Sequence, residues 1–549
     1  MAPLKHRIPV RLRQNWKLVA LCAAFLTACW GLFGSGTIRP YVTTTQAAEA
    51  ETVTTNLTGT KDLFDASVAH DVKLTFTDGA YEDMLGEYFK DGEKKYVEAD
   101  LTIDGTRIPS VGVRLKGNST LRGLTWKGRS KQRTGPGGGG GGGRPEGPPG
   151  DFQPPDGFQP PGNGQPQNGQ PQNGRPQTGQ PQNGQPRNGR PQNGQPQGDG
   201  PPGGGGMFGA QLKGEEPEKL PWLISFDEFV EGRRYQGHSQ VAVRPAAMGS
   251  TTMLNEALGI SVVGASGEPT QRSTYSSFTV NGRSSAPRLL VEYLDEGYAE
   301  GLGDGVLYKS LASSGFTYKG EDQTGYTTDF KQINKVGGKD LQPVIGLVKW
   351  VNEASDAEFA AGLADRLDVT SFARYLVLQN LMVNFDDMAG PGRNYYLWYD
   401  LKAGKFKVIT WDLNLAFSGN ARSGVNDTIS MGFGQGRPPR DATPPGEGGQ
   451  GRPEGGQGRP EGGMMRTGHP LKERFLKNAA FKKIYEEQYR ALYAKLLGDG
   501  TASGLLDGLV AAYKLNEGAD ASKVDAEAQT LRTFLQTRTE ALRSDKAIG

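Results

Sequence analysis

The segment that decides the fold begins Asn384-Phe-Asp-Asp-Met-Ala-Gly-Pro-Gly-Arg-Asn-Tyr-Tyr-Leu-Trp-Tyr399 and ends Trp411-Asp-Leu-Asn-Leu-Ala-Phe417. Its first part is crowded with glycine, proline, aspartate and asparagine, which indicates a loop. The aromatic run that follows, a turn at Ala403-Gly404 and a further apolar run predict a β-hairpin. Because a short hairpin brings its outer ends together, we expect Asn394 before it and Asp412 after it to converge.

The sequence around this segment changes from strand-like to helix-like patterns. Residues 368–383 have helical periodicity with a cap at Asp368 or Thr370, and the stretches 471–497 and 498–542 also read as helices. A short helix opened by Ser/Thr caps is expected at 251–258. Alternating apolar residues predict strands in the N-terminal half, within residues 72–76, 111–115, 222–226, 241–243, 277–280 and 289–292. A β-rich half followed by an α-rich half predicts the α+β class.

Two tracts interrupt these patterns. Residues 135–206 repeat Asn-Gly-Gln-Pro-Gln, and residues 432–463 repeat Gln-Gly-Arg-Pro-Glu-Gly-Gly. Such segments have too little apolar surface to offset their ordering entropy, so both are predicted to be disordered. Strand patterns continue on both sides of the first tract, so we expect it to interrupt one β-rich lobe. Each tract is interpreted either as a tolerated surface insertion or as a functional segment, a spacer or a cell-wall contact.

The N-terminus has the pattern of an export signal. Five basic residues precede the uncharged run 18–36, and no acidic residue occurs before Glu49. Three outcomes stay open: cleavage near residues 47–50, a lipid on Cys29 within the lipobox-like 26–29, or a retained membrane anchor. We therefore expect an exported protein, secreted or attached to the cell surface, that meets the membrane only through this leader.

These features divide the chain into a leader at 1–50, a main domain at 60–497 and a helical extension at 498–549. Both cysteines, Cys22 and Cys29, lie in the leader, which excludes disulfides, cysteine-ligated zinc and a cysteine nucleophile from the folded region. The four histidines are scattered, so no metal cluster or catalytic triad is expected. A net charge of +2 gives no indication of a nucleic-acid partner.

The order of helix, acidic loop, asparagine, hairpin and aspartate suits phosphoryl transfer from ATP, which needs positioned oxygens and little covalent chemistry. Asp386, with Asp387 as the alternative, would orient the acceptor hydroxyl and take its proton. Asn394 and Asp412 would supply hard oxygen ligands for Mg²⁺ or Mn²⁺. The competing interpretation is turn chemistry, since aspartate and asparagine are common in loops.

The same segment resembles the core signature of the CotH kinase family, named after a spore-coat protein. Further blocks resemble that family in the same order, at residues 113–119, 219–229, 253–258, 291–292, 305–309 and 469–471. The resemblance implies an atypical two-lobed protein-kinase-like fold that phosphorylates proteins on Ser/Thr. It makes Asp386 the catalytic-loop aspartate, Asn394 a magnesium ligand and Asp412 the metal-binding aspartate. Asn414 departs from the aspartate that many relatives have there, which removes one anionic ligand.

The nucleotide side is defined less sharply. By analogy with ordinary kinases, Glu256 on the short helix would pair with a cation, and Lys219, Arg244 and Lys309 are the candidates. The family block favours Lys309, although a lone lysine is usually a solvated surface charge. Glu292 marks either a hinge between lobes or an ordinary strand end. Most aromatic residues of the hairpin are expected to pack in the core.

Three functions are consistent with these sequence features. The first is an exported kinase that uses ATP and Mg²⁺ or Mn²⁺ to phosphorylate proteins of the cell surface or spore coat. The second is a silent surface or adhesion module, against which the joint presence of Asp386, Asn394 and Asp412 argues. The third is nucleotidyl transfer by the same centre. Export makes the source of ATP the main question about the first.

Overall fold

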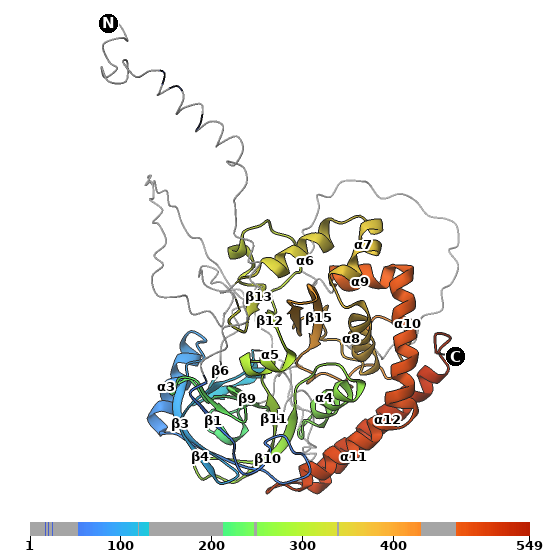
Figure 1. The fold of residues 1–549 in the computed structure, drawn as a ribbon. Coiled ribbons are helices and arrows are strands. Elements are labelled where there is room, and N and C mark those ends of the chain that lie inside the picture. The colour runs from blue at the N-terminus through green and yellow to red at the C-terminus, as the bar shows by residue number, and fades with distance from the viewer. Residues whose placement is uncertain are drawn as a thin grey trace, which may run out of the picture.

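The computed structural model describes residues 53–118, 120–130, 212–245, 250–336, 340–429 and 468–548, together with Lys17, Ala20 and Phe25. Both repeat tracts and nearly all of the leader therefore lie outside the described residues, so their predicted disorder and export role stay predictions. Helices and sheets are mixed, as the α+β prediction required. Figure 1 shows a β-barrel formed by the N-terminal half beside the helices of the C-terminal half. Within the described ranges, no helix has both the length and the apolarity needed to cross a membrane.

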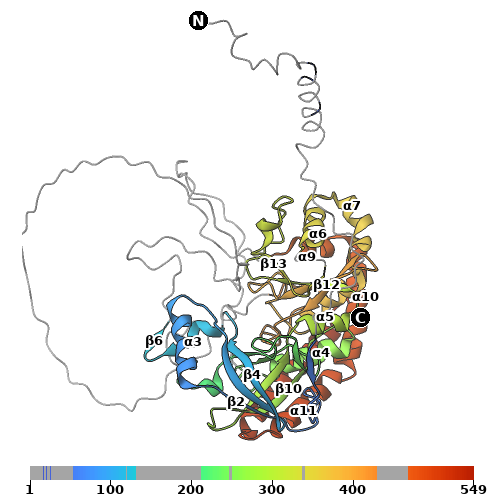
Figure 2. The ribbon, with the colours of Figure 1, turned by 60° about the vertical axis from the view of Figure 1, so that its left-hand side comes forward.

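Seven strands close into the barrel in the order β10-β11-β9-β7-β4-β3-β2, seen from a second side in Figure 2. All neighbours are antiparallel except β10 and β2, whose parallel pairing closes the ring. Alternate side chains fill the barrel, because successive residues of a strand point to opposite faces. The strands are β2 (Asp71–Thr75), β3 (Val97–Ile103), β4 (Thr106–Leu115), β7 (Trp222–Ser225), β9 (Gln240–Val243), β10 (Ser273–Val280) and β11 (Ala286–Glu292).

Smaller elements decorate the barrel. Helix α3 (Asp78–Lys90) begins where the Thr77 side chain accepts a hydrogen bond from the amide of Ala80, an N-cap of the usual kind. The remaining strands near the barrel are short: β1 (Thr55–Leu57), β5 (Thr125–Trp126), β6 (Arg129–Ser130) and β8 (Arg233–Tyr235).

The predicted hairpin is confirmed. Strands β14 (Tyr395–Asp400) and β15 (Lys405–Thr410) pair in antiparallel register, with Tyr395 opposite Thr410. They belong to a four-stranded sheet that β12 (Gly305–Ser310) and β13 (Phe330–Gln332) complete in the order β13-β12-β14-β15. This register places Asn394 and Asp412 at the same end of the hairpin.

Two buried helices carry the segments of interest. Helix α8 (Val369–Leu381) begins at the predicted cap, where Asp368 accepts from the amide of Ser371. Helix α4 (Leu254–Ser266) starts three residues later than expected and runs longer. Its predicted Ser/Thr cap is wrong: Met253 holds the cap position with φ +58° and no side-chain hydrogen bond. The hydroxyls before it bind a carboxylate of the C-terminal helix instead.

The remaining helices pack against the four-stranded sheet, α8, α4 or one another. They are α5 (Glu296–Leu302), α6 (Gln342–Glu353), α7 (Asp356–Gly362), α9 (Pro470–Lys477), α10 (Ala479–Tyr493), α11 (Thr501–Lys514) and α12 (Ala521–Arg543). Both α11 and α12 contact α4. Apolar residues of α11 and α12 belong to the same large core as α4 and α8. Tyr513 of α11 meets Tyr275 of β10 edge to face, with ring centroids 5.2 Å apart. The boundary proposed at residue 497 stays a prediction, but no gap in the core marks it among the described residues.

Candidate active site

The loop after α8 folds back on the carboxylate of Asp386. One oxygen of Asp386 accepts from the amide of Gly392 at 2.6 Å, and the other accepts from Nδ2 of Asn394 at 2.9 Å. A Cβ added to Gly392 would lie 2.6 Å from Asn394 Nδ2 and 2.7 Å from Asp386 Oδ2, so this close approach requires glycine. Since Nδ2 of Asn394 serves Asp386, its amide oxygen is the atom that a cation would bind.

The two aspartates of the doublet have different surroundings. Asp387 is buried, pairs with Lys472 of α9 and accepts from the amide of Ala389 at 2.8 Å. Asp386 lies on the side of Asn394 and Asp412. Burial raises the pKa of Asp386 to about 6, and the charge of Asp412 adds to the rise. A carboxyl poised near neutral pH is suited to accept a proton, and this geometry favours Asp386 over Asp387 for that task.

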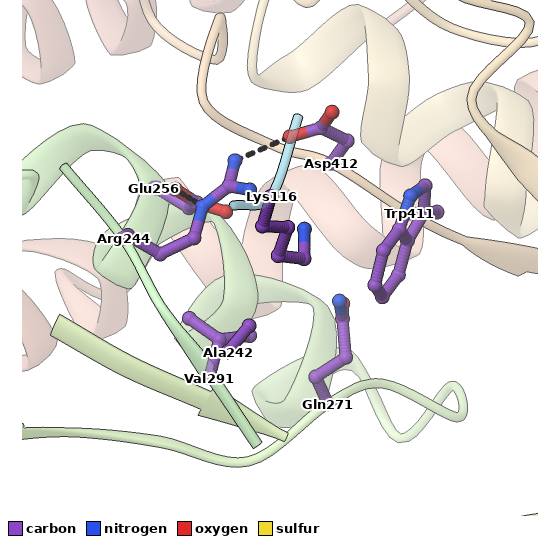
Figure 3. Close-up of a pocket in the computed structure, with 8 residues that line it drawn as sticks. All are labelled: Lys116, Ala242, Arg244, Glu256, Gln271, Val291, Trp411 and Asp412. Carbon is purple, nitrogen blue, oxygen red and sulfur yellow. Dashed lines mark hydrogen bonds and ion pairs between the residues drawn. The ribbon is translucent and has the colours of Figure 1, made fainter. Parts of the chain in front are cut away.

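Arg244 connects the barrel, α4 and the hairpin. It follows β9, and its Nε donates to Oε2 of Glu256 at 2.8 Å while its Nη2 donates to Oδ1 of Asp412 at 2.5 Å (Figure 3). The side chains of Arg244 and Glu256 are 9% and 3% exposed, whereas that of Asp412 is 29% exposed. Burial alone would raise the pKa of Asp412, but Arg244 first and Lys116 second outweigh it and hold that pKa below its usual value.

The structure therefore gives Glu256 a different partner from the Lys309 that the sequence favoured. Lys309 lies on β12 with its ammonium 5.6 Å from the ring centre of Trp411 and 5.9 Å from that of Tyr293. Its charge still reaches Asp412, whose pKa it helps to lower. Lys219 is not brought to the site: its side chain is 60% exposed and pairs with Glu216 at 3.1 Å.

Glu292 ends β11 on the side facing away from Arg244. Its carboxylate accepts from the amide of Arg272 at 2.8 Å and lies 3.4 Å from Nδ1 of His238. Burial raises the pKa of Glu292 to about 7. Its neighbours in sequence, Val291 and Tyr293, face the site instead, and the ring of Tyr293 meets that of Trp411 edge to face at 5.5 Å. The hinge role of Glu292 stays a prediction.

Lys116 is a site residue that the sequence reasoning missed. It follows β4 with its ammonium 5.2 Å from the ring centre of Trp411. Burial, helped by the charge of Arg244, lowers the pKa of Lys116 to about 7. Its position in the sequence could have indicated a site residue, because Lys116 follows an apolar strand and precedes a glycine. In the structure this Gly117 has a φ of +99° and turns the chain.

These side chains line a narrow pocket that opens to solvent (Figure 3). Gln271 contributes a buried amide oxygen that has no hydrogen-bond partner among the described residues, and Figure 3 shows its amide pointing into the pocket. An unpaired buried oxygen is costly unless a ligand uses it. The pocket's lining consists of Lys116, Ala242, Arg244, Glu256, Gln271, Val291, Trp411 and Asp412.

Backbone strain is concentrated around the same segment. Val383, Arg393, Asp412 and Phe417 all have positive φ, from +48° to +61°. This region is unfavourable for residues other than glycine, and most of all for a β-branched valine. Strain of this kind persists only where surrounding structure enforces it, and it clusters at functional sites. Asn414 lies in this segment too, buried, with its carbonyl accepting from Nδ2 of Asn255 on α4 at 2.6 Å.

The fold and site together define a mixed α+β protein in which a barrel, a buried helix and a hairpin converge on clustered charges. The family described as CotH kinase protein matches residues 207–542. The chain therefore belongs to the CotH kinase family, and the sequence resemblance is confirmed. A search of curated proteins finds no match. Family membership suggests a kinase-like activity.

Proposed function

We propose that the protein transfers the γ-phosphate of ATP to Ser or Thr of other proteins. The observation that carries this proposal is the Arg244 bridge, which ties a helix glutamate to the hairpin aspartate beside two further cations. Lys116, Arg244 and Lys309 lie close enough to Asp412 to lower its pKa. Such basic groups suit the phosphates of a nucleotide.

Each site residue would have a separate task. The amide oxygen of Asn394 and the carboxylate of Asp412 fit Mg²⁺ or Mn²⁺, because such ions prefer hard oxygen ligands. A bound metal ion would neutralise charge on the phosphates during transfer. Lys116 and Lys309 would contact phosphate oxygens, and the amide of Gln271 would bind the polar edge of the nucleotide. Asp386 would orient the acceptor hydroxyl and take its proton.

The finer parts of the proposal extend beyond the site. We propose an atypical two-lobed kinase-like fold in which the barrel acts as the nucleotide lobe and residues 135–206 and 432–463 are disordered insertions. Substrates would be proteins of the cell surface or spore coat, reached after export through the leader. Export supports such substrates and requires that ATP be supplied outside the cell or met before export ends.

The test is transfer of label by the purified full-length chain. ATP labelled at the γ-phosphate is incubated with the protein, a casein-like acceptor and Mg²⁺ or Mn²⁺, beside Asp386→Asn and Asp412→Asn. Asp365→Asn, an exposed aspartate remote in sequence from the loop, is the matched control. We expect transfer by the unmodified chain and the control only.

Two results would change the conclusion. Absence of both transfer and a nucleotide-dependent rise in thermal stability would leave the silent surface or adhesion module as the function. Label entering from the α-phosphate instead of the γ-phosphate would replace phosphoryl transfer by nucleotidyl transfer.

A further inference from the structure

Helix α12 binds the segment just before α4 through the carboxylate of Glu527, which accepts several hydrogen bonds from it. Its oxygens accept from the hydroxyl of Ser250 at 2.9 Å, from the amide of Thr251 at 2.7 Å and from the hydroxyl of Thr252 at 2.6 Å. The hydroxyl of Thr251 donates to it as well. Although burial raises the pKa of Glu527, these donors outweigh it and leave the pKa below its usual value. These hydrogen bonds therefore keep the Glu527 carboxylate ionised, although the donors are far away in sequence: Thr252 and Glu527 are 275 residues apart.

This contact replaces the local cap that the start of α4 lacks. Serine and threonine normally cap a helix by accepting from its first free amides. Here Met253 occupies the cap position in a left-handed conformation without a side-chain cap. The hydroxyls point to α12 instead, and a second brace comes from Tyr275 of β10, whose hydroxyl donates to the carbonyl of Thr252 at 2.8 Å. The position of the first turn of α4 is thus set from outside the helix.

The first turn of α4 carries the glutamate of the candidate active site. Glu256 is the third residue of α4 and lies four residues after Thr252 in the chain. From Glu256 the contacts continue to Arg244 and from Arg244 to Asp412. Hydrogen bonds, together with the short stretch of chain from Thr252 to Glu256, therefore join Glu527 to the predicted metal-binding aspartate.

The same helix also holds the other side of the site. Arg538 is fully buried and donates to the carbonyl of Asn380 at 2.9 Å, to its amide oxygen at 2.6 Å and to the carbonyl of Leu381 at 3.3 Å. These groups form the C-terminal end of α8, where a cation is favourable. The loop with Asp386 follows directly. Eleven residues separate Glu527 from Arg538, which is close to three turns and about 16 Å along one face of the helix.

We propose that α12 acts as a strut of the nucleotide site, in which Glu527 is a positioning residue that acts through α4 on Glu256 and Arg244. The proposal rests on the proposed function, since it names what keeps that site assembled. The direction of the change in ATP affinity distinguishes positioning from a simple charge effect. Removing a negative charge near the site would by itself favour an anionic nucleotide, whereas loss of positioning weakens nucleotide binding.

The experiment measures ATP affinity with Mg²⁺ by calorimetry, on the full-length chain, for Glu527→Gln and for the matched control Glu540→Gln. Glu540 is an exposed glutamate of the same helix. We expect Glu527→Gln to weaken ATP binding roughly tenfold, because small displacements of a site cost this much or more, and Glu540→Gln to leave it unchanged. Unchanged or tighter binding by Glu527→Gln would overturn the proposal. Failure of the unmodified chain to bind ATP would instead overturn the proposed function.

A double-variant cycle separates positioning from general loss of stability. If Glu527 acts through Glu256, then adding Glu527→Gln to Glu256→Gln should weaken binding by less than about twofold, because coupled residues are not additive. If Glu527→Gln lowered ATP affinity equally in the unmodified chain and in Glu256→Gln, Glu527 would act independently of Glu256, and the proposed role of α12 would be refuted.

A milder variant covers the case in which Glu527→Gln does not fold. Thr251→Val removes one hydroxyl donor at an exposed residue and keeps the side-chain shape. We expect faster hydrogen exchange of the Ala257 amide, which donates to the carbonyl of Met253, than in Glu540→Gln, measured without nucleotide. Equal exchange in the two variants would contradict the anchoring of α4 by α12.

Discussion

Replacing Arg244 by glutamine should destabilise the protein severely, and by an amount that depends on pH. The change leaves Glu256, whose side chain is 3% exposed, without the guanidinium that contacts it at 2.8 Å. Removing one partner of a buried ion pair typically costs about 3–5 kcal/mol, because the other charge is left buried and uncompensated. Asp412 is 29% exposed and can be solvated, so most of the cost should come from Glu256.

The pH dependence follows from the sign of the change at Glu256. Without Arg244, burial should raise the folded pKa of Glu256 well above its value in the unfolded chain. The unfolded state then releases a proton at a lower pH than the folded state does, so stability falls as pH rises between the two values. The deficit of Arg244→Gln should therefore be larger at pH 8 than at pH 5. Urea unfolding followed by fluorescence at both pH values measures it.

Two comparisons make this prediction specific. The double variant Arg244→Gln/Glu256→Gln removes both charges, so it should be more stable than the sum of the single costs implies, by about 2 kcal/mol or more. Arg107→Gln, which removes an ion pair with Asp100 whose side chains are 73% and 47% exposed, should change the unfolding midpoint little. A cost below about 1 kcal/mol for Arg244→Gln at pH 8, or strict additivity in the cycle, would refute the reasoning.

Three further predictions concern the ligand site. Since the pKa of Lys116 is about 7 in the free protein, a bound phosphate should raise it, so nucleotide binding should take up a proton and weaken as pH rises above 7; calorimetry in buffers of different ionisation enthalpy detects this, and Lys116→Met should abolish it. Gly392→Ala should lower the transfer rate about tenfold or more through the displaced Asp386 carboxylate, whereas Gly346→Ala, where the added methyl meets nothing within 4 Å, should not; steady-state rates compare them. Asp386→Asn should abolish transfer and lower the thermal midpoint less than Asp387→Asn does, because the latter breaks the buried pair with Lys472; the reverse pattern would exchange the two roles.

Elements defined by local sequence could be predicted well. The hairpin follows from two apolar runs around a glycine turn, and its register brings Asn394 and Asp412 together as expected. Helix α8 was predicted with a cap at Asp368 or Thr370, and Asp368 is the one observed, because a cap depends on residues three positions apart. The start of α4 was predicted wrongly, because the serine and threonine hydroxyls that would cap it bind Glu527, far along the chain.

The site itself depends on contacts that the sequence does not display. Lys116 and Arg244 come together because β7 pairs with both β4 and β9, and Arg244 then binds Asp412. Strands β4 and β7 lie on opposite sides of the 135–206 tract, so no turn motif announces their pairing. Which aspartate of the doublet, Asp386 or Asp387, takes the proton also depends on a contact that the sequence does not display. Both residues suit a loop equally well, and only Lys472, 85 residues away from Asp387, separates them by engaging one of the two carboxylates.

The use of arginine at position 244 explains how the two carboxylates of the site are held together. A guanidinium offers several donors in a fixed plane, so Arg244 holds Glu256 and Asp412 at once, which the compact ammonium of a lysine does less well. The same bridge holds Asp412 in its strained conformation at φ +55°. Because Arg244 already occupies Oδ1 of Asp412, a metal ion must share this carboxylate or bind its other oxygen. The strength of the bridge therefore affects both the position of Asp412 and the ease with which this carboxylate can bind a metal ion.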